Sequence, residues 1–380
     1  MKRSHVVVIG AGSTGAAITH DLALRGLQVT LVERFGPAAG TTGHNQAQLH
    51  SGARYAVTDP ASARECIEEN TILRKIMPNA LELNDGLFIA LEEDHLRYRE
   101  LFLDSCAQCG IPTEQIAPTQ ALDMEPLLNP KLLAAIRIPD GVFDPYRFTL
   151  SFLATARKNG ATFLQFSEVI GLDPARGQVT IHNHITSKLQ IIGCDAIVNA
   201  AGPWAARIAA MTGISLSLEP SAGVMAIVDK RLCNMVINLL APPDDGDIIV
   251  PQRNSSILGT TSWTVDDPDH IAIPQGHVAQ LLQLAEWMIP TTKQTHLRGV
   301  MAAARPLIKD ASGGRSASRV HRCYDHAEDG VPGFFSIIGG KTTTARRMAE
   351  DISNMVCARL SVDVPCRTRT ELLLSHRLSI

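Results

Sequence analysis

The feature that most constrains the fold is a glycine-rich turn near the start of the chain. The apolar run Val6–Ile9 leads directly into Gly10-Ala-Gly12-Ser-Thr-Gly15. A short β-branched run of this kind is typical of a buried parallel strand, and residues 16–25 follow it with good helix formers. A strand, a tight turn and a helix are therefore predicted at the N-terminal end of the chain.

The spacing of the glycines gives each of them a separate role. Gly10 permits the tight turn, Gly12 lets the backbone approach a pyrophosphate, and Gly15 lets the helix pack closely on the strand. The start of the helix, with Ser13 and Thr14 in the turn, offers N–H groups and a partial positive charge to phosphate oxygens. The turn predicts a dinucleotide site, and a glycine-rich turn without a ligand is the alternative.

A second predicted strand, Val29–Val32, completes a βαβ unit and ends on Glu33. The dinucleotide-binding fold places an acidic residue at this point, where it accepts hydrogen bonds from a ribose diol. The motif by itself does not distinguish FAD from NAD.

The rest of the chain alternates between helical and strand patterns and predicts an α/β fold. The expected helices are at 61–77, 94–108, 147–158, 275–288 and 345–360, and the expected strands are at 86–91, 195–202, 223–228, 247–250, 256–259 and 334–338. Short strands separated by turns dominate residues 216–304. We therefore expect a discontinuous nucleotide-binding domain (1–80, 146–215 and 305–380) and an inserted, mixed α+β substrate domain (81–145 and 216–304).

Composition restricts the partners and the compartment. The 35 Lys+Arg and 38 Asp+Glu give a net charge of −3, which argues against nucleic acid as the main partner. The apolar runs are far shorter than the ~20 residues that span a bilayer, and no secretory signal precedes the first strand. Eight scattered Cys, including the Cys106/Cys109 pair, are expected to be reduced structural thiols, with no metal site. A cytoplasmic protein is predicted, with peripheral attachment to the inner face of the cell membrane left open.

Three further segments carry a resemblance to a known family. They are residues 33–45, which include Gly40-Thr-Thr-Gly43-His-Asn45; 198–204, with Ala201-Gly202; and 339–344, with Gly339-Gly340-Lys341-Thr-Thr-Thr344. Together with the glycine turn they resemble the glycine-oxidase-like and glycerol-3-phosphate-dehydrogenase-like flavoproteins. The resemblance implies a glutathione-reductase-type Rossmann domain with FAD as the cofactor. It implies FAD contacts at Arg34, Thr41, Thr42, Asn45, Ala201, Gly202, Gly339, Gly340, Lys341, Thr342 and Thr343, besides the turn and Glu33.

The segment 49–58, Leu-His-Ser-Gly-Ala-Arg-Tyr-Ala-Val-Thr, resembles the large subunit of anaerobic, FAD-dependent glycerol-3-phosphate dehydrogenases. That resemblance implies oxidation of the secondary alcohol of sn-glycerol 3-phosphate, or of a close polyol phosphate, to the ketone by hydride transfer to flavin N5. It assigns substrate contacts to Arg54, Tyr55, Arg305, Arg319 and Lys341, with His50 and Arg305 in the catalytic group.

Phosphate binding and alcohol oxidation both require residues of these types. A dianionic phosphate needs several cations in one cleft, and Arg offers a planar fork of donors where Lys offers a point charge. The hydroxyl proton needs an acceptor, and the ordinary pKa of His50 suits proton acceptance near neutral pH. A purely structural hydrogen bond of His50 beside FAD is the alternative.

Some positions depart from the family pattern and keep other functions open. Ala345 precedes Arg346 where the family usually has Tyr, and Ala302-Ala-Ala304 and Gln46-Ala-Gln48 also differ. An oxidase or dehydrogenase of amino or 2-hydroxy acids is one alternative, and an FAD-holding subunit without its own turnover is another. The Cys-rich C-terminal extension of the anaerobic large subunits is not present in the sequence, so the expected electron acceptor is a quinone, oxygen or a separate subunit.

Overall fold

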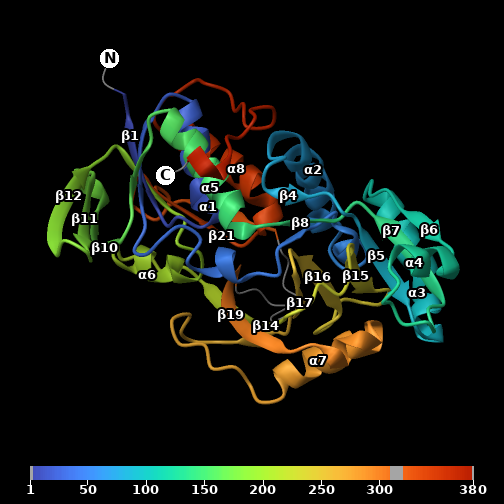
Figure 1. Ribbon diagram of the computed structural model, residues 1–380. Coiled ribbons are helices and arrows are strands. Elements are labelled where there is room, and N and C mark those ends of the chain that lie inside the picture. Colours follow the sequence, from blue (N-terminus) through green and yellow to red (C-terminus); the bar gives the residue numbers. More distant parts are fainter. Residues whose placement is uncertain (1–2, 309–319, 379–380) are drawn as a thin grey trace.

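A six-stranded sheet forms the centre of the molecule (Figure 1). The computed structural model describes residues 3–308 and 320–378. In spatial order the strands of this sheet are β20 (Arg322–Asp325), β21 (Phe334–Ile338), β13 (Ala196–Asn199), β1 (His5–Ile9), β2 (Gln28–Val32) and β9 (Thr162–Leu164). The edge strand β20 is antiparallel to β21, and the other pairs are parallel. The predicted βαβ unit is confirmed, with β1 and β2 as neighbours.

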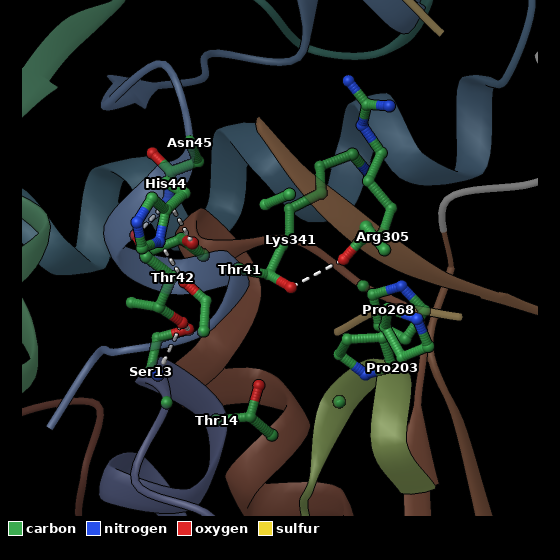
Figure 2. A pocket seen from close by; sticks show the side chains of 18 of the residues that line it. Ser13, Thr14, Thr41, Thr42, His44, Asn45, Pro203, Pro268, Arg305 and Lys341 are labelled. Atoms are coloured by element: carbon green, nitrogen blue, oxygen red, sulfur yellow. Dashed lines mark hydrogen bonds between the residues drawn. The ribbon is translucent and has the colours of Figure 1, made fainter. Parts of the chain in front are cut away.

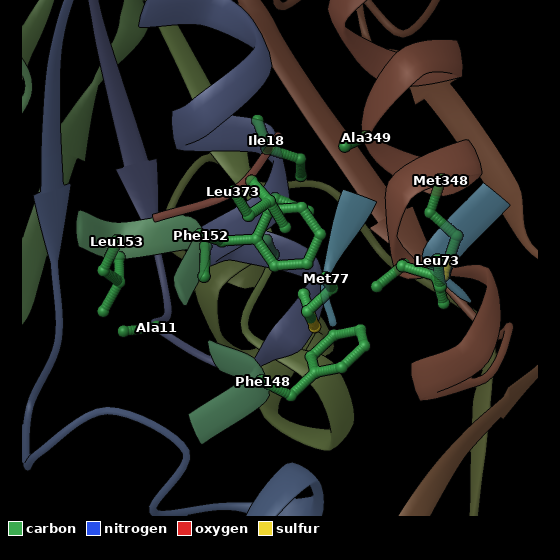
Figure 3. Packing of buried hydrophobic residues seen from close by; sticks show 14 of the residues in the cluster. Ala11, Ile18, Leu73, Met77, Phe148, Phe152, Leu153, Met348, Ala349 and Leu373 are labelled. Carbon is green, nitrogen blue, oxygen red and sulfur yellow. The ribbon is translucent and has the colours of Figure 1, made fainter. Parts of the chain in front are cut away.

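Helices that are far apart in the sequence pack together beside this sheet (Figure 3). They are α1 (Ser13–Leu24), α5 (Pro145–Lys158) and α8 (Ala345–Arg359). Ile18, Phe152 and Ala349 lie in their shared core, and the Phe152 ring centroid is 5.4 Å from that of Phe148. Removing a buried ring such as Phe152 costs about 3–5 kcal/mol, so this cluster contributes strongly to the stability of the half of the molecule that is built on the six-stranded sheet.

A second, mixed sheet of nine strands lies beside the first (Figure 1). Its order is β18 (Trp263–Thr264), β14 (Leu218–Val228), β17 (Ser255–Gly259), β16 (Ile248–Gln252), β15 (Val236–Leu239), β5 (Gly86–Ala90), β7 (Ala134–Ile138) and β6 (Glu114–Ile116), with β19 (Leu297–Ile308) paired to β14. The helices α3 (Glu93–Gln108), α4 (Pro118–Met124) and α7 (His277–Met288) pack against it.

The long β14–β19 ribbon differs from the prediction of short strands. The sequence pattern predicted only residues 223–228 as a strand here and none at 297–308. Gly, Ala and Pro are depleted in strands, and this ribbon contains Gly223, an Ala-rich stretch and the directly opposed Pro220 and Pro306. Pairing along the whole length of the ribbon overrides these local preferences.

Smaller elements complete the fold. They are the antiparallel sheet of β10 (Ser167–Asp173), β11 (Gln178–Asn183) and β12 (Lys188–Gly193), the sheet of β3 (Gln48–Leu49), β8 (Gly141–Phe143) and β4 (Leu81–Glu82), and the helices α2 (Pro60–Ile76) and α6 (Ala205–Ala210). The cysteines are free thiols, and Cys106 and Cys109 are buried. Within residues 3–308 and 320–378, each helix is too short or too polar to cross a lipid bilayer.

The six-stranded sheet draws its strands from the start, the middle and the end of the chain. The discontinuous domain division and its boundaries stay a prediction.

Candidate active site

The turn between β1 and α1 and the first turn of α1 have no room for a side chain at Gly10 or at Gly15. Gly10 adopts a left-handed backbone with φ of +100°, and a Cβ there would lie 2.7 Å from the carbonyl oxygen of Ala200. A Cβ on Gly15 would lie 1.8 Å from the carbonyl oxygen of Gly10. Gly15 is therefore needed for the close packing of α1 on the turn, as predicted, although it does not itself line the cavity described below.

The first turn of α1 is held by a neighbouring loop. The N–H of Ser13 donates to Oγ1 of Thr42 at 3.0 Å, and Asn45 donates to the carbonyl oxygen of Thr42 at 2.7 Å and to Oγ1 of Thr342 at 3.2 Å. Gly12, the N-cap residue, brings no side chain to this end of the helix. Backbone and small hydroxyl groups therefore form this wall, as a phosphate-binding turn requires.

Glu33 lies just past the carboxyl end of β2 and faces the same turn. Its Oε2 accepts the N–H of Ala11 at 2.8 Å, and its Oε1 accepts the N–H of Phe35 at 2.9 Å. Each carboxylate oxygen can accept more than one hydrogen bond, so these contacts fix the carboxylate and leave acceptor capacity for a ribose diol.

A cavity of about 1130 Å³ brings the scattered segments together. In Figure 2, Ser13, Thr42 and Asn45 stand on one side of the view, and Arg305, Pro203 and Pro268 on the other. The predicted residues that line it are His50, Arg54, Tyr55, Arg305, Lys341, Gly10, Gly12, Ser13, Thr14, Glu33, Arg34, Thr41, Thr42, Asn45, Ala201, Gly202, Gly339, Gly340, Thr342 and Thr343. The predicted Arg319 lies outside the described residues.

Three of the cations predicted to contact the substrate, Arg54, Arg305 and Lys341, line this cavity. Arg305, on β19, donates from Nη1 to the carbonyl oxygen of Ala222 at 3.1 Å and from Nη2 to Oγ1 of Thr260 at 3.0 Å. The Nζ of Lys341 lies 4.6 Å from the ring centroid of Tyr55, a cation–π contact. These contacts fix where the positive charges lie.

Arg54 forms an ion pair with a buried carboxylate. Its Nη1 lies 2.6 Å from Oδ2 of Asp247, and its Nη2 donates to the carbonyl oxygen of Asp244 at 3.0 Å. Asp247 is only 3% exposed. Arg54 therefore brings directed N–H donors to the cavity wall.

His50 stands beside these cations. Its backbone N–H donates to Oγ1 of Thr343 at 3.2 Å, and its ring centroid is 5.4 Å from that of Tyr55. Desolvation, followed by the charges of Lys341 and Arg54, lowers the pKa of His50 to about 3. The expectation of a pKa near neutrality is therefore wrong, and the imidazole of His50 is neutral at physiological pH.

Several residues of the cavity wall were not predicted. Thr260 and Thr261 anchor Arg305, and Trp204, Arg207 and Asp269 line the cavity near Arg34. Trp204 lies two residues after Gly202, within the segment 198–204 that carries the family resemblance, so that resemblance was a usable signal. The others have no local pattern that marks them.

The arrangement joins a dinucleotide-type turn, a fixed carboxylate, anion-binding cations and a neutral imidazole in one cavity. Such a site can hold a dinucleotide, bind an anionic substrate beside it and accept a proton from that substrate.

Comparison with known proteins gives a consistent picture. A family model described as FAD dependent oxidoreductase (DAO) matches residues 5–346. One component chain of the anaerobic glycerol-3-phosphate dehydrogenase of Escherichia coli (strain K12) is 42% identical over 373 residues, which cover 96% of this chain and 69% of that protein.

Two solved structures share the architecture. Glycerol-3-phosphate dehydrogenase from Bacillus halodurans, complexed with FAD, has a TM-score of 0.74 and 24% identity, covering 98% of this chain and 68% of that one. Glycine oxidase from Geobacillus kaustophilus has a TM-score of 0.76 and 20% identity, covering 98% and 99%. At such identities the likeness concerns the fold, and the predicted α/β fold with a Rossmann-type sheet is confirmed.

Proposed function

Because this chain belongs to the FAD-dependent oxidoreductase (DAO) family, we propose that it binds FAD and oxidises the secondary alcohol of sn-glycerol 3-phosphate, or of a close polyol phosphate, to the ketone. The observation that carries the proposal is that Arg305, Lys341 and His50 line the same cavity as the glycine turn. The identity to one chain of a glycerol-3-phosphate dehydrogenase supports the substrate class.

The cavity wall suits FAD. Gly10 and Gly12 of the turn line the cavity without side chains, so their backbone is open to a close approach by a pyrophosphate. Glu33 would hold the ribose diol, and the turn with Thr41 and Thr42 would hold the pyrophosphate. When bound, FAD supplies the acceptor for the two electrons that leave the alcohol carbon.

The chain's own groups bind and orient the substrate. Arg305 and Lys341 would attract the dianionic phosphate, and Arg54 would add hydrogen bonds whose direction is fixed by Asp247. Holding the phosphate in one place also places the neighbouring alcohol carbon, which lowers the entropic part of the barrier.

His50 would accept the proton of the alcohol. Oxidation of a secondary alcohol to a ketone removes one proton from oxygen and a hydride from carbon. The imidazole of His50 is neutral, so a ring nitrogen can take the hydroxyl proton. The dianionic phosphate would offset the neighbouring cations and make His50 a stronger base in the complex than in the free protein.

We also propose that the electrons leave this chain for a quinone or for a separate subunit. The Escherichia coli relative is named as one of the subunits of its enzyme, which supports an assembly of several chains. Peripheral attachment to a membrane stays a prediction.

The test is anaerobic addition of sn-glycerol 3-phosphate to the purified yellow protein. We expect the flavin absorbance to bleach. Bleaching only with glycine, proline or lactate-like acids would favour an acid oxidase or dehydrogenase, and the absence of bleaching with every candidate would favour an FAD-holding subunit without turnover.

A further inference from the structure

A segment from the nine-stranded sheet reaches the loops and the helix α6 beside the six-stranded sheet, and the carboxylate of Asp269 makes most of its polar contacts there. This segment, residues 265–276, connects β18 to α7 and is called the strap below. Oδ1 of Asp269 accepts Nη2 of Arg34 at 2.7 Å and Nε1 of Trp204 at 2.8 Å, and Oδ2 accepts Nη1 of Arg207. A single side chain thus binds donors from the loop after β2, from the turn after β13 and from the helix α6.

Further contacts support the same arrangement. Nη2 of Arg207 lies 2.5 Å from Oδ1 of Asp267, which also accepts the N–H of Asp269 at 2.9 Å. The Cζ of Arg34 lies 4.6 Å from the ring centroid of Trp204 and 4.9 Å from that of Phe35. Arg34 is therefore held by aromatic rings as well as by the strap.

The position of these contacts points to the coenzyme. Arg34, Trp204 and Arg207 line the cavity, as do Pro268 and Asp269 of the strap. Arg34 follows Glu33, and an acid at this place in a dinucleotide-binding fold marks the ribose of the adenosine half. The strap therefore forms the cavity wall near the adenosine end rather than near the substrate cations.

We propose that the strap is part of the coenzyme site and that Asp269 is the positioning residue that keeps it closed over the adenosine half of FAD. The inference rests on the proposed FAD-dependent function. It assigns Arg34, Trp204 and Arg207 to holding the strap, so the substrate-side sheet contributes to coenzyme retention. FAD would leave at this end only after the contacts of Asp269 have broken.

The strength of the closure is limited by solvent. The side chains of Asp269 and Arg34 are 30% and 27% exposed, so salt partly screens their attraction. Three donors on one carboxylate nevertheless act together, because opening the strap breaks all of them at once. The closure is therefore expected to govern the rate of FAD release and to depend on ionic strength.

The test measures FAD release from the purified holoprotein after dilution, followed as the rise in fluorescence of free flavin. For Asp269→Asn we expect a release rate about tenfold above that of the wild type, which corresponds to about 1.4 kcal/mol. Raising the salt from about 0.01 M to about 1 M shortens the screening length from about 30 Å to 3 Å and should speed release from the wild type more than from the variant.

Asp266→Asn is the matched control, because it removes the same charge from the same strap. Asp266 is exposed and is not paired with Arg34, Trp204 or Arg207 in the part of the chain that the structure describes. We expect its release rate to match that of the wild type. Equal release rates in Asp269→Asn, Asp266→Asn and the wild type would overturn the proposal, as would an equal acceleration in both variants.

A second variant covers the outcome in which Asp269→Asn is isolated without flavin. Trp204→Phe keeps an aromatic ring beside Arg34 and removes only the Nε1 donor, so it should speed release by about threefold, near the lower end of the range for the loss of a single hydrogen bond. If Trp204→Phe releases FAD at the wild-type rate while Asp269→Asn is isolated without flavin, the proposed role of the strap is contradicted. The loss of flavin in Asp269→Asn would then reflect a folding defect in that variant. The readout uses no substrate, so a failure of glycerol 3-phosphate to bleach the flavin would count against the proposed reaction alone.

Discussion

The two ends of the cavity are built in different ways. At the nucleotide end, the turn between β1 and α1 is one contiguous stretch of sequence, and its geometry depends on the absence of side chains at Gly10 and Gly15. At the cationic end, Arg54, Arg305 and Lys341 come from distant segments and are held by partners from other elements. Recognition by backbone therefore leaves a compact motif in the sequence, whereas recognition by charge depends on pairs that only the folded chain brings together.

The largest expected effect tests the backbone end. In Gly15→Ala, the new Cβ would lie 1.8 Å from the carbonyl oxygen of Gly10, so α1 must move away from the turn. We expect a protein that is purified with little or no flavin, measured as flavin absorbance per protein. Gly193→Ala in β12 is the control, since a Cβ there meets no atom within 4 Å. A Gly15→Ala protein with the wild-type flavin content would show that the turn tolerates side chains.

The next effect tests the chemistry at the cationic end. His50→Asn removes the proton acceptor, so we expect the rate of flavin reduction by glycerol 3-phosphate to fall by about 10²–10⁴. Stopped-flow absorbance on variant protein with a full flavin content measures this rate. A loss within about twofold would instead assign His50 a structural role beside the coenzyme.

A smaller effect separates charge from shape. Lys341→Met keeps the length of the side chain and removes the charge, so binding of a phosphorylated substrate should weaken by about 10- to 100-fold, the range for hydrogen bonds to charged groups. The KM for glycerol 3-phosphate and the flavin reduction rate with unphosphorylated glycerol are to be compared. Equal losses for both compounds would remove Lys341 from phosphate binding.

The pair of Arg54 and Asp247 predicts a modest and non-additive effect. Asp247→Asn leaves the guanidinium less well directed, so we expect the KM for glycerol 3-phosphate to rise by a few fold, about 1 kcal/mol. Adding Asp247→Asn to Arg54→Ala should change little more, because the partner is already gone. Additive losses in this double-mutant cycle would show that Asp247 acts independently of Arg54.

The smallest expected effect concerns the protonation of His50, whose ring should not titrate near neutral pH. Burial and the charges of Lys341 and Arg54 lower the pKa of His50 to about 3, so its ring nitrogens should keep their neutral NMR shifts as the pH falls from 7.5 to about 5.5. Comparison with His50→Asn identifies the signal. In Lys341→Met the pKa of His50 should rise, because a positive neighbour has been removed. A His50 signal that titrates near pH 6.5 in the wild type would mean that the site is more hydrated than the structure indicates.

Much of the nucleotide half could be predicted because its signals are local. The strand Val6–Ile9, the glycine turn and the acid at position 33 follow one another within a short stretch, and the structure contains β1, α1 and β2 there. The helices at 60–76 and 345–359 also follow from local apolar periodicity. The strand β19 could not be predicted, since its Ala-rich sequence acquires strand geometry only by pairing with β14.

The candidate site shows the same difference between features with a local sequence signal and features that depend on long-range contacts. Resemblance to a family gathered the cations and His50, and those that the structure describes do line one cavity. Their partners were missed because Asp247 lies 193 positions from Arg54, and Asp269 lies 235 positions from Arg34. No local pattern relates such pairs. The lowered pKa of His50 was missed for the same reason, since it depends first on how deeply the fold buries the ring and then on how closely Lys341 and Arg54 approach it.

The discontinuous six-stranded sheet has a consequence for synthesis on the ribosome. The glycine turn emerges among the first residues, yet its neighbour in the sheet, β13, ends at Asn199, and β21 and α8 follow only after Gly333. One edge of β1 therefore stays unpaired in the nascent chain until β13 is made, and one edge of β13 stays unpaired until β21 is made, after β14 to β19 of the substrate-side sheet. Chaperone contacts during translation are expected to concentrate on these unpaired strand edges, because exposed strand edges aggregate readily.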